Sequence, residues 1–285
     1  MTSPIHAIST PDGRYYTIPG YEDIAFRSVT NAVGIMSKPA LMKAYANRAA
    51  HRAVDYSLTV ASIEMVEGTD AAVKWIASAM PEYAAQAAAL GSAVHFACEH
   101  YREHVIELDG YEVAFDDWLT DSLVPYAGKM GKPEAKAIEH IRKHVIQYRR
   151  ALDEQGITIL DRERTVFSVK WAYAGTLDAI VRVRDNNYVM DIKTGGIYGD
   201  SLSLQLAAYR HAPRMVTSGT TCEREVAIHG GCALQLKPRS YKFHFVRCDN
   251  VAFEHFLAAM RLCEWRATED LIGPHWEAHD WRDAV

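Results

Sequence analysis

The 285-residue sequence predicts an α/β fold of the α+β kind, and three observations support this. A β-hairpin is expected where two runs of apolar and β-branched residues, 177–183 and 188–192, flank a turn of Asp and Asn residues at 185–187. Apolar residues recur at helical spacing before this hairpin, at 134–155, and after it, from 202 to about 217. The remaining strands are expected at 157–168, 226–236 and 241–246. The predicted order is therefore helix, three strands, helix and two strands.

The first part of the chain is expected to be mainly helical, after a short strand or hairpin around residues 14–18. Helices are predicted to begin near Ser28, which suits an N-cap, and at Pro39, because proline fits a first helical turn. Further helices are expected at 56–66, 69–80, 82–106 and 251–268, with a loop region and a short helix at 107–132. We expect a helical N-terminal extension, 1–82, packed on a core formed by 83–285, in one compact domain overall.

Composition and charge constrain the class of protein. Hydrophobic residues make up 49% of the chain, enough for a large core, and no apolar run approaches the roughly 20 residues that span a bilayer. No signal peptide is visible at the N-terminus, so a cytoplasmic protein without membrane association is expected. The net charge of −5 counts against a nucleic-acid partner, although positive charge confined to one groove would not show in this sum. The five scattered cysteines indicate reduced thiols, without a disulfide framework or a zinc ribbon.

Each strand of the predicted hairpin carries one acid where a fold would favour an apolar residue. Asp178 lies near the start of the first strand and Asp191 near the end of the second, so antiparallel pairing brings them side by side. Lys193 follows Asp191 by two residues, and both side chains therefore leave the same face of the strand. Such a cluster is costly to bury unless the charges pair or hold a cation, and oxygen ligands suit Mg²⁺ or Mn²⁺. The alternative is an exposed strand end with a salt bridge between Asp191 and Lys193.

Four short motifs follow one another along the chain. They are G-S-x-V-H-x-x-x-E at 91–99, G-x-x-D at 175–178, D-x-K-T-G at 191–195 and Q-x-x-x-Y at 205–209. Together they resemble the RecB-type branch of the PD-(D/E)xK nucleases, which includes RecB nuclease domains, CRISPR-associated adaptation nucleases and many phage exonucleases. The similarity covers about residues 95–209. Leu177 stands where the family name has proline, a common variation in this branch.

The resemblance implies a restriction-endonuclease-like αβββαβ core with a mixed central sheet, and a metal-dependent site. In such a site Asp178 and Asp191 hold Mg²⁺ or Mn²⁺, the backbone carbonyl of Ile192 adds a ligand, and Lys193 acts on the attacking water. His95 would be a further ligand that shifts the preference towards Mn²⁺; the alternative is a buried core histidine. With an ordinary pKa near ~6.5, His95 would strengthen metal binding as the pH rises from about 5.5 to 7.5.

Other residues are candidates for supporting roles. Glu163 would hold a second metal ion or orient DNA, with a structural ion pair as the alternative, and Glu99 and Thr194 would lie behind the ligands or contact DNA. Gln205 and Tyr209, four apart on one helical face, would bind the DNA backbone or position Lys193, with ordinary helix packing as the alternative. The four cysteines that carry an iron–sulfur cluster in some CRISPR-associated relatives have no counterparts, so no such cluster is expected.

The resemblance favours an exonuclease that acts on single- or double-stranded DNA ends in phage or bacterial recombination, repair or replication. An endonuclease is one alternative, and a catalytically inactive nucleic-acid-binding protein of the same fold is another. A structural or assembly protein with a coincidental D-x-K remains a third. The expected partners are DNA, a second copy of the chain or a recombination protein, and the expected location is the cytoplasm, that of the host if the chain is phage-encoded.

Overall fold

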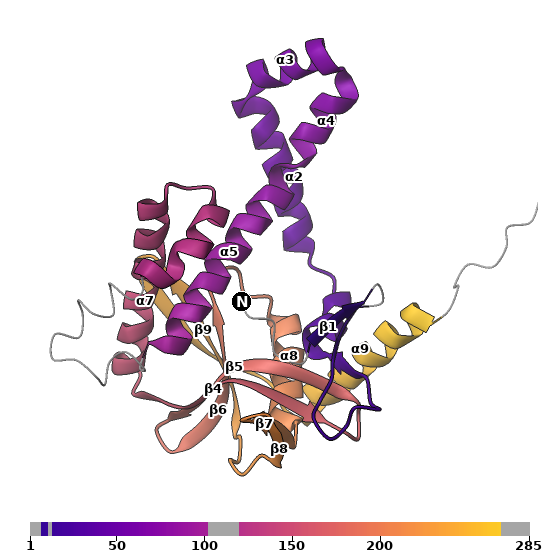
Figure 1. Ribbon diagram of the computed structural model, residues 1–285, viewed down its shortest axis with the longest axis vertical. Coiled ribbons are helices and arrows are strands. Elements are labelled where there is room, and N and C mark those ends of the chain that lie inside the picture. Colours follow the sequence, from indigo (N-terminus) through magenta and orange to yellow (C-terminus); the bar gives the residue numbers. More distant parts are fainter. Residues whose placement is uncertain (1–6, 11–12, 102–119, 269–285) are drawn as a thin grey trace, which may run out of the picture.

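The protein has a mixed α/β fold in which a ten-stranded sheet carries helices on both faces (Figure 1). The computed structural model describes residues 7–10, 13–101 and 120–268. Both parallel and antiparallel pairings occur in the sheet, which confirms the predicted class and the mixed sheet. The strands are β1 (Ala7–Thr10), β2 (Gly13–Tyr16), β3 (Phe26–Ser28), β4 (Ile157–Ser168), β5 (Tyr173–Val183), β6 (Asn186–Lys193), β7 (Arg214–Thr217), β8 (Thr220–Glu223), β9 (Gly230–Lys237) and β10 (Ser240–Val246).

Helices come before, between and after these strands. They are α1 (Val29–Ala32), η1 (Val33–Ile35), α2 (Pro39–Asp55), α3 (Ser57–Glu67), α4 (Thr69–Ala77), α5 (Ala79–His100), η2 (Gly128–Met130), α7 (Glu134–Glu154), α8 (Gly199–His211) and α9 (Asn250–Thr268). Residues 120–127 are also helical. Within the described ranges, no helix is long and apolar enough to cross a membrane.

Strand β5 is the centre of the sheet because three other strands pair with it. On one edge, β4 runs antiparallel along nearly its whole length. The opposite edge is shared: β3 pairs in parallel with Tyr173 and Ala174, and β6 pairs antiparallel with 179–183. Between these two pairings, residues 175–178 have no strand partner on that edge in the described structure, so the sheet forks there. We call this stretch the fork.

Two apolar clusters cover the sheet. On one face α5 and α7 pack against β5, β6 and β9, and α7 buries the residues that recur at helical spacing, among them Ile141 and Tyr148. On the other face α8 and α9 pack against the same strands, around Leu206 and Phe256. Because β5 and β6 lie between these clusters, side chains at the fork are reached from both sides of the sheet.

The predicted hairpin is confirmed, but its turn is shorter than the expected 185–187 and begins one residue earlier. Asn186 already pairs with Val183, so the turn consists of Arg184 and Asp185, and Arg184 has a left-handed φ of 53°. The helix after the hairpin ends at His211 and not near 217, because Pro213 lacks the N–H that would continue it. The chain then forms β7 and β8. The following strand begins at Gly230, four residues later than the prediction of 226–236.

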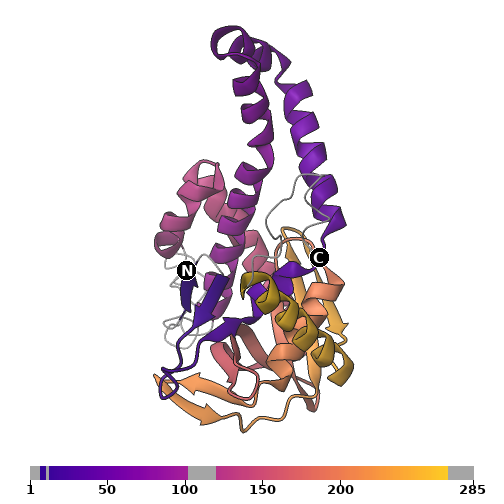
Figure 2. The same ribbon diagram turned by 90° about the vertical axis from the view of Figure 1, so that its right-hand side faces the viewer.

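The long helix α5 begins at Ala79, three residues before the predicted start, with Pro81 inside its first turn. The predicted continuation to residue 106 and much of the loop at 107–132 lie outside the described residues. Helices α2, α3 and α4 and the first turns of α5 project from the body as an arm, residues 39–85, in which α2 and α5 run side by side (Figures 1 and 2).

The N-terminal region contains strands as well as helices. Strands β1 to β3 join the sheet, and β3 pairs directly with β5. Helix α5 passes residue 82 without a break, so the division into 1–82 and 83–285 stays a prediction.

Gly175 gives the first testable prediction. A Cβ at this position would lie 2.7 Å from a ring carbon of Tyr209 and 3.2 Å from the Cβ of Val29. We expect Gly175→Ala to lower the free energy of unfolding by about 1–3 kcal/mol, because the ring and the fork must move apart. Urea unfolding measures this. Gly34→Ala, whose Cβ would meet nothing within 4 Å, is the matched control. Equal stability of Gly175→Ala and the wild type would contradict the close packing.

Candidate metal centre

Asp178 takes the place of a strand partner at the fork. The pairing of β5 with β6 ends at Ala179 and Met190. Two residues further along β6, the backbone N–H of Ile192 donates to Oδ2 of Asp178 at 2.6 Å. The other oxygen, Oδ1, lies 3.5 Å from Nδ1 of His95. The Asp178 carboxylate therefore satisfies a backbone donor on one side and faces an imidazole on the other.

His95 reaches the fork from α5 and contacts β5 through Asp178 and β6 through Ile192. Its Nε2 lies 2.8 Å from the carbonyl oxygen of Ile192, the atom that the sequence resemblance implied as a ligand. Burial alone lowers the pKa of His95, but Asp178 and Asp191 outweigh it and raise the pKa to about 9. The imidazole is therefore protonated at neutral pH without a bound cation, and it donates to Ile192. The pH window for metal binding lies higher than the ordinary pKa predicted.

Glu163 completes the group from β4. The pairs Arg162 with Ala179 and Arg164 with Leu177 place it across from Asp178, and its φ of 47° marks a local distortion of the strand. Burial, and after it the charge of Asp178, raise the pKa of Glu163 to about 8. One ligand atom from each of His95, Glu163 and Asp178 lies within 4.8 Å of the others. These three residues, which we call the metal group, could hold a metal ion.

Asp191 lies beside the metal group on the α8 side of the sheet. Its Oδ1 accepts from Nζ of Lys193 at 2.7 Å and from Nε2 of Gln205 at 3.2 Å. Its Oδ2 is buried and has no hydrogen-bond partner in the described structure. Burial, and then the charge of Asp178, raise the pKa of Asp191 to about 6. An unpartnered buried carboxylate oxygen is costly, and a nearby cation would offset that cost.

The donors around the fork fit a metal ion. They are carboxylate oxygens, one imidazole and the Ile192 carbonyl, all of which are metal ligands in proteins. A cation would also favour ionisation of Glu163, since positive charge counteracts the desolvation that keeps it protonated. Lys193 stays protonated in this setting, because Asp191 and Asp178 outweigh the effect of burial and raise its pKa.

Gln205 and Tyr209 lie one turn apart on α8, as predicted, and they form a chain of contacts behind Asp191. Nε2 of Gln205 lies 3.4 Å from the Tyr209 hydroxyl in addition to its contact with Asp191. Tyr209 is only 2% exposed and packs against Gly175. The geometry therefore gives Gln205 a positioning contact with Asp191, whereas Tyr209 supports Gln205 from the core.

The remaining predicted residues surround the site. Glu99 lies one helical turn beyond His95, and its charge adds to the raised pKa of Glu163. The carbonyl of Thr194 accepts from Nζ of Lys237 at 2.9 Å, and the Gly195 carbonyl accepts from Gln235 at 2.6 Å. Gln235 and Lys237 hold the loop after Lys193 and were missed by the sequence analysis. Gln235 belongs to the predicted strand 226–236 and Lys237 directly follows it, but the parallel register of this strand with β6 has no local signal.

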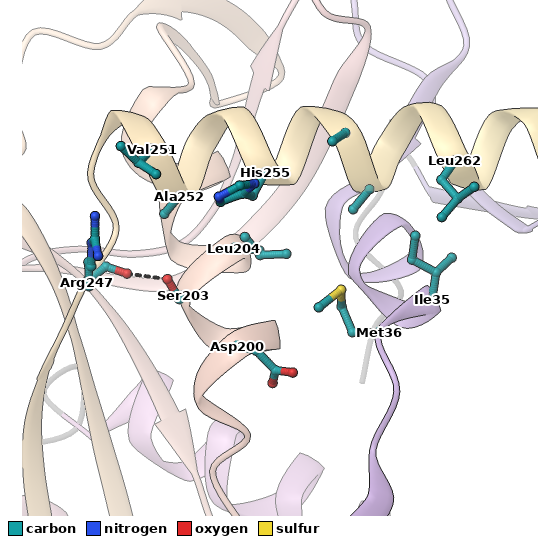
Figure 3. A pocket seen from close by; sticks show the side chains of 12 residues that line it. Ile35, Met36, Asp200, Ser203, Leu204, Arg247, Val251, Ala252, His255 and Leu262 are labelled. Atoms are coloured by element: carbon teal, nitrogen blue, oxygen red, sulfur yellow. Dashed lines mark hydrogen bonds between the residues drawn. The ribbon is translucent and has the colours of Figure 1, made fainter.

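A hollow of about 530 Å³ lies elsewhere, between η1, α8 and α9 (Figure 3). Its lining is mainly apolar, including Met36, Leu204 and Leu262, and the Ser203 hydroxyl donates to the carbonyl of Arg247 at its edge. Because none of the metal group lines this hollow, it is separate from the candidate centre.

Comparisons with known proteins add little to this picture. No protein-family model and no curated protein matches the sequence. Among solved structures, one titled "Crystal structure of SSO0001" is similar over 65% of this chain and 88% of its own, with 15% identity and a TM-score of 0.28. A similarity this weak carries no argument about fold or function.

Proton release gives a prediction for the metal group. At pH 7 both His95 and Glu163 hold a proton without metal, and a ligating imidazole or carboxylate must lose it. We expect roughly two protons to leave for each Mn²⁺ bound. Calorimetric titrations in buffers of different ionisation enthalpy measure this number. His95→Ala and Glu163→Gln should each lower it by about one, whereas His140→Ala on α7 should leave it unchanged. If the wild type released close to zero protons for each Mn²⁺ bound, His95 and Glu163 would not be the ligands.

The same shifts predict the pH dependence of stability without metal. Folded Glu163 keeps its proton up to about pH 8 and folded His95 up to about pH 9, against 4.5 and 6.5 in the unfolded chain. The folded state therefore binds more protons in this interval, so its stability falls as the pH rises. We expect Tm to drop by roughly 5 °C or more between about pH 5 and 9.

Mn²⁺ should restore the lost stability at the upper end of this interval, because it binds the deprotonated ligands. Thermal unfolding with and without the ion tests both statements. In Glu163→Gln, Tm should depend less on pH below about pH 8, because the raised pKa of Glu163 is then absent. Glu134→Gln, at an exposed position of α7, is the control. A wild-type Tm that rises over this interval without metal would contradict the proposed protonation states.

Proposed function

We propose that this chain is a metal-dependent nuclease that hydrolyses phosphodiester bonds in DNA. The observation that carries the proposal is the meeting of the metal group with the Asp191–Lys193 pair at one fork of the sheet. A carboxylate- and imidazole-lined site with an adjacent ammonium suits a reaction in which negative charge develops on phosphate oxygens. The resemblance of the four motifs to RecB-type nucleases supports the same function.

Mg²⁺ or Mn²⁺ is the ion we propose, because the ligand set is rich in oxygen and contains one imidazole that favours Mn²⁺. When bound, such an ion polarises a phosphate oxygen and makes water a stronger nucleophile. Asp178, Glu163 and His95 would hold it. Asp191 would add its free Oδ2, which Gln205 and Lys193 keep in place through contacts to Oδ1.

Lys193 would stabilise the developing charge on the phosphate. Its side chain is about one-third exposed, and its ammonium is held by Asp191. Because its pKa is raised, the ammonium keeps its proton at neutral pH, which suits a charge-stabilising donor better than a base. The Asp191 contact restrains the amine at the edge of the site, so little reorganisation is required when substrate binds.

Among nucleases, an exonuclease that acts on DNA ends is the proposal that the motif resemblance favours, with an endonuclease as the alternative. We also propose that it acts in the cytoplasm, in phage or bacterial recombination, repair or replication, where a recombination protein would be a partner. A nucleic-acid-binding protein that has lost catalysis is less well supported, since it has no chemical need for Asp178, Asp191 and Lys193 together.

The decisive experiment compares linear and circular DNA, single- and double-stranded, with labelled ends and with Mg²⁺ or Mn²⁺. Cleavage of linear DNA alone supports an exonuclease, whereas cleavage of circles supports an endonuclease. Asp191→Asn, which keeps the shape but removes the charge, should abolish either activity. DNA binding without any cleavage would favour the inactive relative, and the absence of both would refute the proposed function.

Lys193→Ala gives a kinetic prediction. The ammonium is proposed to act on charge that develops during the reaction, so kcat should fall by roughly 10²–10³ with little change in KM. Lys136→Ala, at an exposed position of α7, is the matched control and should keep both kcat and KM. A raised KM with unchanged kcat would instead make Lys193 a residue that binds ground-state phosphate.

A further inference from the structure

The arm exposes an unusual amount of apolar surface at its far end. Helices α2 and α3 bury no residue, although together they contain 28 residues. The large hydrophobic side chains with the highest exposed fractions in the described structure all lie here: Leu58 (86%), Met65 (85%), Val66 (78%) and Val54 (74%). Apolar side chains gathered this way on a projecting element indicate an interaction surface. We call residues 54–70 the tip.

Charge is divided sharply between the tip and the helix that leads to it. Residues 38–54 contain four Lys and Arg residues and no acid, whereas residues 55–70 contain four Asp and Glu residues and no Lys or Arg. The acidic tip disfavours nucleic acid as its partner, because phosphates would be repelled. Its partner therefore needs apolar side chains flanked by positive charge.

The first half of α2, residues 39–48, has this chemistry, and we call it the stem. Met42 is 69% exposed and Tyr45 is 40% exposed, and Lys43 lies beside them on the surface. The side chains of Lys43 and, at the tip, Glu67 make no hydrogen bond or ion pair in the described structure. Within one chain the tip cannot cover its own stem, since the two lie at opposite ends of an α2 helix about 25 Å long.

We infer that the arms of two copies of this chain pack antiparallel, with the tip of each copy on the stem of the other. Such a contact is two-fold symmetric and closes after two copies, because each arm offers both complementary surfaces. It covers Leu58 and Met65 with Met42 and Tyr45, and it pairs the acidic tip with the basic stem. A tip-to-tip contact would instead place four acids against four acids. The inference does not depend on the proposed nuclease activity.

The mass of the full chain in solution tests this pairing without DNA or metal. Sedimentation equilibrium should show a concentration-dependent dimer of the 31.9 kDa chain. The double substitution Leu58→Asp and Met65→Asp should yield a monomer, and its far-UV circular dichroism should stay that of the wild type because both side chains are exposed. Ile146→Asp, at a 56% exposed position of α7, is the matched control and should remain dimeric. A monomeric wild type, or a dimeric double variant, would overturn the inference.

Charge exchange provides a sharper test. Lys43→Glu and Glu67→Lys should each raise the dimer Kd by about tenfold, because each change weakens two symmetric contacts. An equal mixture of the two variants should regain the wild-type Kd, since the mixed dimer has one original and one reversed contact. A mixture as weak as its components would refute the exchange of tips and stems. If Lys43→Glu lowers DNA affinity and leaves the mass unchanged, the stem binds DNA and the inference is wrong.

Discussion

One short stretch of strand edge, residues 175–178 of β5, determines where the polar chemistry of this protein lies. Strand β3 pairs with β5 before this stretch and β6 pairs after it, and neither pairs with the stretch itself. A sheet that forks leaves backbone donors to be satisfied, and Asp178 satisfies the N–H of Ile192 with a carboxylate. The same acid then faces His95 and Glu163. A requirement of backbone hydrogen bonding thus fixes the position of a titratable group.

The charges at the fork are interdependent. Asp178 keeps a lowered pKa in spite of burial because His95 carries a proton, and Glu163 and Asp191 have raised pKa values partly because Asp178 is ionised. This buried group of charges is energetically unfavourable without a cation. His95 and Glu163 then carry protons, and Oδ2 of Asp191 has no hydrogen-bond partner in the described structure. Apolar residues in place of such buried charges are often stabilising, so the fork gives up stability in the way that the proposed metal site requires.

Local patterns in the sequence were sufficient to predict the hairpin, the helix at 134–155 and the same-face placement of Asp191 and Lys193, because alternation and helical spacing depend on near neighbours. The sequence analysis named Glu163 as a ligand for a second metal ion or a DNA contact. Its place in one group with His95 and Asp178 was not predictable, since this depends on the β4–β5 register and on a left-handed residue in mid-strand. The contacts of Gln235 and Lys237 likewise depend on a parallel pairing across some forty residues. Strands β7 and β8 were missed because each has only four residues, too few to show a pattern.

Helix α5 connects the arm with the metal group. Its C-terminal half lies on the sheet through small side chains, Ala89, Ala93 and Ala97, and this close approach lets the His95 ring reach the Ile192 carbonyl. Its N-terminal turns belong to the arm, where Glu82 forms an ion pair with Arg52 of α2. Helix α5 has 22 residues, a length of about 33 Å, and it continues from the arm through Gly91 and Ser92 to His95. The arm and His95 therefore lie on the same helix, whereas Asp178 and Glu163 are positioned by strands of the sheet.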